Sequence, residues 1–291
     1  MSLTAPTLSD IMHGSFSELG QLVSGVTTAG DGISLTDSLL KGKDDAWNQG
    51  TAFITYDVGG SGAAPEGEFA RITDYVRTSG KVTADFSEDV ATGDHYALAS
   101  RRWSTDDMIA IVNRGLRRLG NIPKLDETLT TAANQTEYTL PAGLKGSLRK
   151  VWRLTSTTTD NEKPVKMSDW YVQNGILIFR RQPPSGQVLR LTGMGTHARL
   201  SLFGDTLDIA IALERAIAET TYHAYRFLIK RTEGEDRGLF QDANDAADYR
   251  DEARTEYPIV APLPEYKPTW MPVESRRQQR RRSSKYGPYL Q

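Results

Sequence analysis

The chain has 291 residues, of which 38% are hydrophobic and 25% charged, and it contains no cysteine. This composition is typical of globular domains and excludes collagen-like, coiled-coil and disordered chains, while the lack of cysteine excludes disulfide frameworks and thiolate metal sites. The formal net charge is only −2, so no uniform field draws the whole molecule to nucleic acid or to a membrane.

The N-terminus reads MSLTAPTLSDIMHGSFSELG, which lacks the basic segment and the long apolar run of a signal peptide. No apolar window reaches the roughly 18 residues that a membrane-spanning helix needs. Residues 1–46 are rich in Ser, Thr and Gly, and their weak periodicity predicts an N-terminal arm of turns and loops.

Residues 47–100 are expected to form a small β module. Short β-favouring segments alternate there with Gly-rich turns, a pattern typical of an antiparallel sheet or barrel. The predicted strands cover residues 51–57, 68–76, 81–86 and 94–98.

Residues 101–257 are expected to form an α+β core that begins with a helix. Ser104 is a favourable capping residue, and apolar residues recur at helical spacing from Ile109 to Leu119. Gly120 and Pro123 predict the end of this helix.

The rest of the core is predicted as strands followed by two long helices. The strands are expected at 136–140, 148–154, 170–173, 176–180 and 187–192, with Asn174–Gly175 as a hairpin turn. The helices are expected over 206–231, capped by Asp205 or Thr206, and over 236–257. The predicted fold class is therefore α+β: a helical-bundle core with a small antiparallel sheet and hairpin, an additional N-terminal β module and an extended C-terminal arm.

Residues 258–291 are expected to form a Pro-rich linker and an Arg-rich C-terminal tail. Five prolines lie between Pro258 and Pro272, and they favour an extended chain. Six basic residues against one acid give residues 274–291 a charge of +5, which leaves −7 for residues 1–273 out of the total of −2. An acidic body thus carries a basic tail.

Three interpretations of this tail are open: a docking peptide for an acidic groove, a nucleic-acid contact, and an idle solubilising segment. The aromatic residues that follow the basic run favour docking, because Arg and aromatic side chains dominate interface hot spots. The predicted docking residues are Arg276, Arg277, Arg280, Arg281, Arg282, Lys285, Tyr286, Tyr289 and Leu290.

No cofactor, metal or catalytic site is predicted. Gly193–Ala198 matches G-x-G-x-x-A without a surrounding βαβ pattern, so a flexible strand end is preferred over a dinucleotide site. Glu219 precedes His223 by four residues, but the rest of a zinc motif is absent, and the carboxylates of 236–256 are expected to form a solvated, ion-paired helix face. Because no nucleophile is paired with a base, the chain is not expected to be an enzyme.

The order of segments resembles that of tailed-bacteriophage head–tail adaptors of the connector, head-completion or tail-tubular type. The resemblance covers roughly residues 35–257, and the β module, with ARITDYVRTSGKVT and GDHYAL, is similar to a segment that recurs in phage virion proteins. The segments that carry the resemblance are STDDMIAIVNRGLRRLGNIP, TEYTLPAGLKGSLRKVWRL, DWYVQNGILIFRRQPPSGQVLRLTGMG and the Ala-rich helix after them.

The resemblance implies a structural virion protein that forms a homo-oligomeric ring, a dodecamer, around the DNA channel and docks to the portal through its C-terminal tail. Its implied partners are the portal, a tail nozzle, tube or other neck protein and, transiently, genomic DNA, with no membrane. It implies a place in the neck of the virion and synthesis in the cytoplasm of the infected bacterium. Two alternatives are a nucleic-acid-binding phage accessory protein that uses the Arg-rich tail, and a glycan-acting or glycan-binding tail protein that uses Trp47, Tyr56 and Tyr75.

Overall fold

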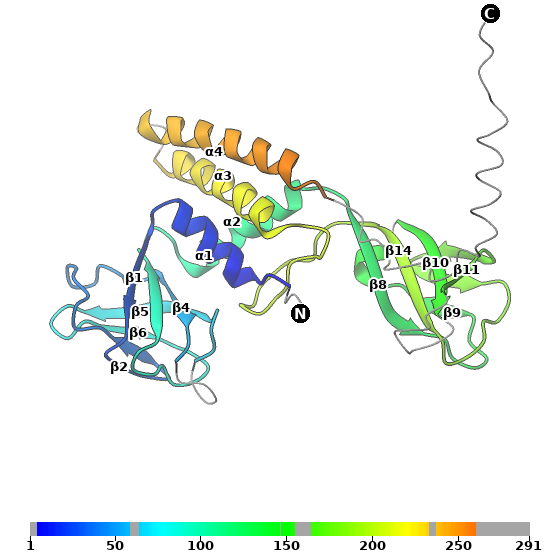
Figure 1. Cartoon of the computed structure of the whole chain (residues 1–291), viewed down its shortest axis with the longest axis horizontal. Coiled ribbons are helices and arrows are strands. Elements are labelled where there is room, and N and C mark those ends of the chain that lie inside the picture. The colour runs from blue at the N-terminus through cyan, green and yellow to red at the C-terminus, as the bar shows by residue number, and fades with distance from the viewer. Residues whose placement is uncertain (1–4, 59–63, 146, 155–163, 233–236, 260–291) are drawn as a thin grey trace, which may run out of the picture. The chain divides into compact units, whose positions relative to one another are not determined.

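The computed structural model describes residues 5–58, 64–145, 147–154, 164–232 and 237–259. These residues hold three β-sheets built from fourteen strands, four α-helices and one short 3-10 turn (Figure 1). The expectation of a helical-bundle core with a small sheet is therefore wrong, because the described chain is mostly β-structure. All the described residues belong to one compact unit, Met1–Ala261.

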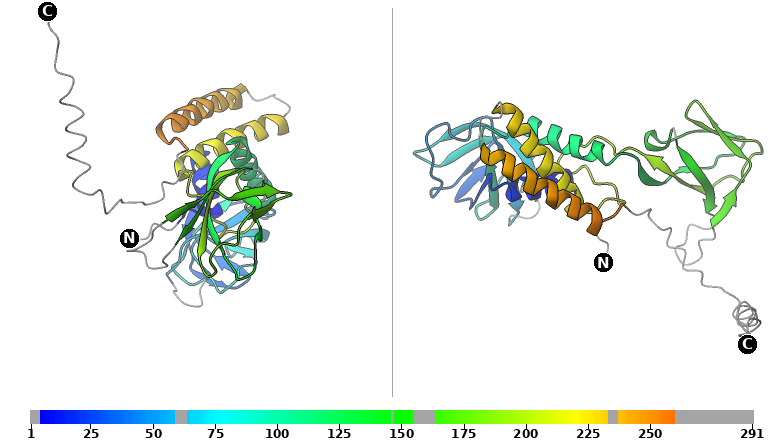
Figure 2. Two further views of the ribbon diagram at one scale, coloured as in Figure 1. Left: turned by 90° about the vertical axis from the view of Figure 1, so that its right-hand side faces the viewer. Right: turned by 90° about the horizontal axis from the view of Figure 1, so that it is seen from above.

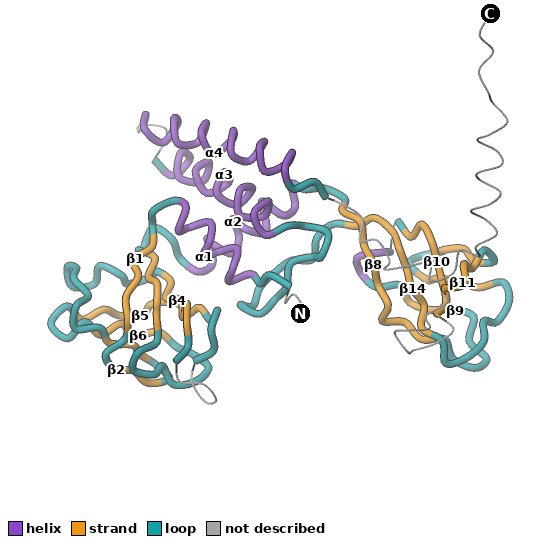
Figure 3. The backbone as a smooth tube through the Cα atoms, in the orientation of Figure 1, coloured by secondary structure: helices purple, strands orange, loops and turns teal. Residues whose placement is uncertain are grey.

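The first sheet is seven-stranded and antiparallel, with the order β1-β7-β4-β5-β6-β3-β2. It curls around its own apolar cluster, in which Tyr75, Ile72 and Leu98 are fully buried (Figure 3). The four strands predicted in the β module are confirmed. The strands are β1 (Leu22–Val26), β2 (Ala29–Asp31), β3 (Ser34–Thr36), β4 (Thr51–Tyr56), β5 (Phe69–Val76), β6 (Lys81–Ala84) and β7 (His95–Ala99).

The N-terminal segment is more ordered than a set of loops, which corrects that prediction. Helix α1 (Leu8–Glu18) is capped by Thr7, whose side chain accepts a hydrogen bond from the backbone N–H of Asp10. Strands β1–β3 then complete the first sheet. They are short and partly exposed, so their side chains carry little of the alternation from which a strand is predicted.

The four helices pack on a second apolar cluster around α3 (Leu213–Arg231). Helix α3 contacts α1, α2 (Thr105–Arg118) and α4 (Arg237–Glu256), and the α3–α4 pair runs side by side in each view (Figures 1 and 2). The predicted helix 104–119 is confirmed, with Ser104 as its cap. Its buried residues are Met108, Ile111, Val112, Asn113, Gly115 and Leu116.

Helix α3 starts later than the sequence predicts. Asp205 does not cap it; its carboxylate accepts the backbone N–H groups of Ser201 and Leu202 at 2.6 and 2.9 Å and so closes a turn. Thr206 forms an isolated bridge with Thr7 instead. The helix begins at Leu213, after Ala212, with no side-chain cap.

Two further sheets lie between α2 and α3 in the sequence. The hairpin predicted at Asn174–Gly175 is confirmed, and both residues adopt positive φ (52° and 75°). The four-stranded sheet has the order β11-β10-β14-β8 and the three-stranded sheet the order β12-β13-β9, and residues of both form a third core cluster that includes Val151, Leu177 and Leu191. Their strands are β8 (Ile122–Thr130), β9 (Glu137–Thr139), β10 (Leu148–Leu154), β11 (Pro164–Met167), β12 (Trp170–Gln173), β13 (Ile176–Phe179) and β14 (Val188–Gly195).

The part of the chain that the structure describes contains no helix with the length and apolar character that crossing a bilayer requires.

Candidate functional site

The nine predicted docking residues, Arg276 to Leu290, and the linker from residue 260 onward lie outside the described residues. The same holds for the glycine-rich loop at 59–62.

The glycines of the Gly193–Ala198 motif have a packing role. Both Gly193 and Gly195 lie in β14, where a Cβ would stand 2.5 Å from the carbonyl oxygen of Ser147 and 2.0 Å from that of Gly143, respectively. The backbone at Gly143 and at Ser147 thus approaches β14 more closely than any side chain allows. A dinucleotide site would require a helix directly after these glycines, whereas the next helix, α3, begins only at Leu213.

His197 of the same motif lines a cavity of about 370 Å³ together with Lys124 and Asp208. Its Nε2 accepts the backbone N–H of Asp208 at 3.0 Å, and its Nδ1 lies 2.6 Å from the carbonyl oxygen of Ala198. These partners assign the proton to Nδ1 and use both ring nitrogens. Burial is the main reason that the pKa of His197 is lowered, so the ring is neutral and bound on both sides. Lys124 and Asp208 form an ion pair beside it.

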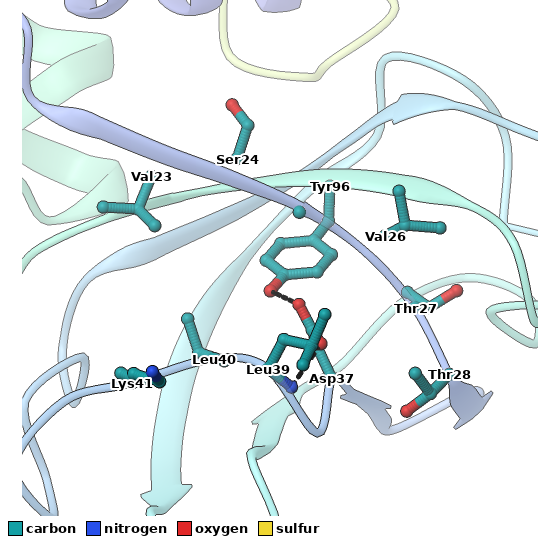
Figure 4. A pocket seen from close by; sticks show the side chains of 11 residues that line it. Val23, Ser24, Val26, Thr27, Thr28, Asp37, Leu39, Leu40, Lys41 and Tyr96 are labelled. Atoms are coloured by element: carbon teal, nitrogen blue, oxygen red, sulfur yellow. Dashed lines mark hydrogen bonds between the residues drawn. The ribbon is translucent and has the colours of Figure 1, made fainter.

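A larger hollow, of about 640 Å³, lies beside β1 in the first sheet (Figure 4). Tyr96 points its hydroxyl at Asp37 and donates to Oδ2 at 2.7 Å, while Oδ1 accepts the backbone N–H of Leu39 at 2.7 Å. Burial and the hydrogen bond to Asp37 raise the pKa of Tyr96, which therefore stays protonated as a donor. Gly25 passes directly over this ring. Tyr96 and Asp37, two buried polar residues of the hollow, are thus engaged with each other.

The aromatic residues of the glycan hypothesis do not form one exposed platform. Tyr75 is fully buried and donates its hydroxyl to the carbonyl of Leu40 at 3.2 Å. Trp47 packs against the core of the first sheet, and only Tyr56 is exposed. Within the described ranges, no three His, Cys, Asp or Glu side chains gather in a set that could hold a metal ion.

The most distinctive surface is a group of arginines on helices α2, α3 and α4. We call Arg114, Arg118, Arg226 and Arg250 the basic face. The Arg250 guanidinium lies 4.1 Å from the centre of the Tyr222 ring, and Arg226 donates to the Tyr222 hydroxyl at 3.1 Å. Among the described residues, no carboxylate lies within ion-pairing distance of the first three, whereas Arg250 binds Asp251 at 2.8 Å.

The electrostatic effect of the basic face is visible at His223, which is only 8% exposed. Its pKa is lowered to about 4, first by burial and then by the charges of Arg114, Arg118, Arg226 and Arg250. The positive charges of arginines from three helices therefore act together on His223, and no nearby carboxylate among the causes offsets them. From the sequence, His223 was considered only as a metal ligand and this face was missed, because the two arginines of α2 lie more than a hundred residues from those of α3 and α4. The local signal was Arg114 and Arg118, two like charges spaced i and i+4 on α2.

The low pKa of His223 predicts a pH-dependent contribution to stability. Because the folded-state pKa lies below the ordinary value of 6.5, the contribution is complete above pH 6.5 and is lost as the pH falls toward about 4. Between pH 7 and pH 4.5, urea unfolding should show that the native protein loses about 2 kcal/mol more than the His223→Gln variant. Equal losses in the two proteins would contradict this assignment.

Helix α4 is held against α3 by a buried carboxylate. Glu219 is 1% exposed; its Oε1 accepts Nε of Arg254 at 2.5 Å, and its Oε2 has no partner among the described residues. Arg215 lies beside this pair and donates to the backbone carbonyl of Tyr257 at 3.0 Å. The carboxylate thus connects α3 and α4, which carry two of the four arginines of the basic face.

We expect the Glu219→Gln substitution to destabilise the α3–α4 contact. It removes a buried charge that faces two arginines, and it should lower the free energy of unfolding by about 2 kcal/mol, less than for a fully buried pair because Arg254 can regain water. Hydrogen exchange should show faster exchange along α4. The exposed Glu252→Gln serves as the matched control and should change the unfolding free energy by less than about 0.5 kcal/mol. An equal effect in both variants would refute the role of the Glu219–Arg254 contact in holding α4 against α3.

No family model and no curated protein matches the chain. Among solved structures, the regulatory domain of Toxoplasma gondii PKA, in a co-crystal with cAMP, matches with 9% identity and a TM-score of 0.20. The match covers 65% of this chain and 88% of that one. At that TM-score, the match carries no argument about fold or function.

Proposed function

We propose that the protein is a head–tail adaptor of a tailed bacteriophage, a structural virion protein whose copies form a ring between the portal and the tail. The ring surrounds the DNA channel, and residues 258–291 dock to the portal. The ordered set of sequence segments supports this proposal through its resemblance to such adaptors.

The single observation that carries the proposal is the basic face. Arg114, Arg118 and Arg226 are exposed and have no ion-pairing carboxylate within the described part of the chain, so they repel one another in the isolated subunit. Covering them with an anionic protein surface relieves this repulsion and is favourable. A subunit with such a face is better suited to binding another protein surface than to remaining a monomer.

Native mass spectrometry tests the proposal directly. The purified protein is measured alone and after mixing with a purified portal ring. We expect copies to join the portal in a fixed multiple that matches the number of portal subunits. A protein that leaves the mass of the portal unchanged would refute the adaptor function.

The same arginines also favour a second function, that of a nucleic-acid-binding accessory protein in which the basic tail adds to the basic face. This function predicts that the affinity for duplex DNA falls steeply with salt, with a logarithmic slope of about −0.9 per neutralised phosphate. A fluorescence-anisotropy titration at several salt concentrations separates the two functions, because an adaptor need not bind free DNA.

A further inference from the structure

The α3–α4 pair carries opposite charges along its two sides. Arg226 and His223 lie on the side of α3 that faces α2, where Arg114 and Arg118 act on His223. Glu214 and Tyr225 lie on another side of the same helix, because positions 214 and 225 are eleven residues apart and return to nearly the same angle. Positions 223 and 226 point well away from that angle. The sequence of α3 therefore separates a basic from an acidic side.

The second side carries exposed carboxylates from α1, α3 and α4. We call Glu18, Glu214, Asp242, Asp245 and Glu252 the acidic face; all five are exposed, and no Lys or Arg among the described residues is within ion-pairing distance of them. Tyr249 lies among them and is 38% exposed. Burial and then the charges of Glu18, Glu214 and Glu252 raise its pKa.

The pKa of Tyr225 shows the same field at another point of the acidic face. It is raised by burial and then by Asp242 and Asp245. Tyr222 lies one turn earlier on α3 and meets arginines instead: burial raises its pKa, but hydrogen bonds and charges of Arg226 and Arg250 outweigh burial and lower it. Two tyrosines three residues apart on α3 are thus shifted in opposite directions, because arginines act on one and carboxylates on the other.

We propose that the basic face of one copy docks on the acidic face of a second copy. This inference rests on the proposed function and names the contact by which its ring would close. The α3–α4 pair contributes to both faces, with Arg226 and Arg250 in the basic one and Glu214, Asp242, Asp245 and Glu252 in the acidic one. The two faces carry opposite charges, and each has a tyrosine beside it, Tyr222 and Tyr249. Faces that differ on the two sides of a subunit give a head-to-tail contact, which generates a closed ring when its rotation closes.

A second copy suits the basic face better than nucleic acid does. The body of the protein, residues 1–273, has a net charge of −7, and this charge repels a polyanion that approaches from solution. A protein partner need only present a local acidic patch, and the same chain supplies one. Charge pairs at such a contact set its specificity and its register.

Two charge-reversed variants test the contact. Variant A carries Arg114→Glu, Arg118→Glu and Arg226→Glu on the basic face. Variant B carries Glu18→Lys, Asp242→Lys and Glu252→Lys on the acidic face, all away from the first turns of their helices. The matched control carries Arg149→Glu and Lys150→Glu, two exposed residues of β10 that lie on neither face. Thermal unfolding verifies that all of these proteins fold.

The readout is the number of copies that assemble, alone and on the portal ring, by native mass spectrometry. We expect A and B to lose at least about tenfold in assembly affinity, because like charges then meet at the contact. Mixed in equal amounts, A and B should assemble again, since each reversed face meets its reversed partner, and the mixed assemblies should alternate. The control should assemble as the native protein does.

The outcomes separate this inference from the proposed function. If native protein, A and B all assemble on the portal equally well, the contact is wrong and the adaptor function stands. If A alone loses binding to duplex DNA while assembly is unchanged, the basic face is a nucleic-acid surface and the contact is again wrong. If the native protein neither self-assembles nor joins the portal, both the contact and the function fail.

Discussion

Replacing Trp103 with alanine should lower the free energy of unfolding by about 3–5 kcal/mol, the range seen for large aromatic residues in cores. Trp103 is fully buried between β7 and α2, 4.8 Å from the ring of Phe16 in α1 and 6.1 Å from that of Phe227 in α3. Its Nε1–H donates to Gln21 at 3.3 Å, and its carbonyl accepts the Thr51 hydroxyl at 3.2 Å. One side chain therefore joins two helices to the first sheet.

Urea unfolding followed by circular dichroism measures this loss. Trp103→Phe should retain part of the stability, since a smaller ring still contacts Phe16 but the hydrogen bond to Gln21 is lost. Leu39→Ala is a suitable control, because Leu39 is 78% exposed and its removal should cost less than about 0.5 kcal/mol. A loss at Trp103 as small as that at Leu39 would contradict the central position of this residue.

Truncation after Ile259 should abolish portal binding while the body remains folded. The cut removes all nine predicted docking residues but retains Ile259, which packs against the helical core. Because Arg and aromatic residues concentrate binding energy, we expect a loss of roughly a hundredfold or more in affinity for the portal ring. Affinity is measured by surface plasmon resonance on immobilised portal, and folding by thermal unfolding.

A full-length variant separates the chemistry of the tail from its length. It replaces the five arginines between Arg276 and Arg282 and Lys285 with glutamine and retains the aromatic residues. If docking depends on charge, this variant should bind nearly as weakly as the truncated protein, and binding should weaken with salt. Normal portal binding by the truncated protein would refute docking through the tail.

Local patterns were sufficient to predict most of the secondary structure. The Ser104 cap and the apolar spacing after it identified α2, and Asn174–Gly175 identified the β12–β13 hairpin. Strand β8 was missed because Pro123 was interpreted only as a helix stop. Pro123 lies in an edge strand of its sheet, opposite Met194, where the missing N–H is tolerated.

Helix α1 was missed for a different reason. Its residues Leu8, Ile11 and Met12 follow helical spacing, but three serines and Gly14 obscure the pattern. Gly14 lies close to α3, since a Cβ there would stand 2.5 Å from Cδ1 of Ile217 and that side chain would have to move. The fold class was wrong because such long-range contacts, and the short strands β1–β3 and β11, leave little trace in local sequence. The two charged faces were missed likewise, since each combines residues from different helices.

The packing of α1 against α3 affects how the chain can fold during its synthesis. The backbone of Leu8 bonds to Asp205, and Ser15 donates to the carbonyl of Ile217 at 3.4 Å, so α1 gains these contacts only after about two hundred more residues are made. At about 5–20 residues per second this takes on the order of ten seconds or more. The sheets of β4–β7 and β8–β14 draw on contiguous stretches and can form on the ribosome earlier. The part of α1 that packs on α3 therefore stays uncovered on the nascent chain until α3 emerges, and during this interval a chaperone can bind it.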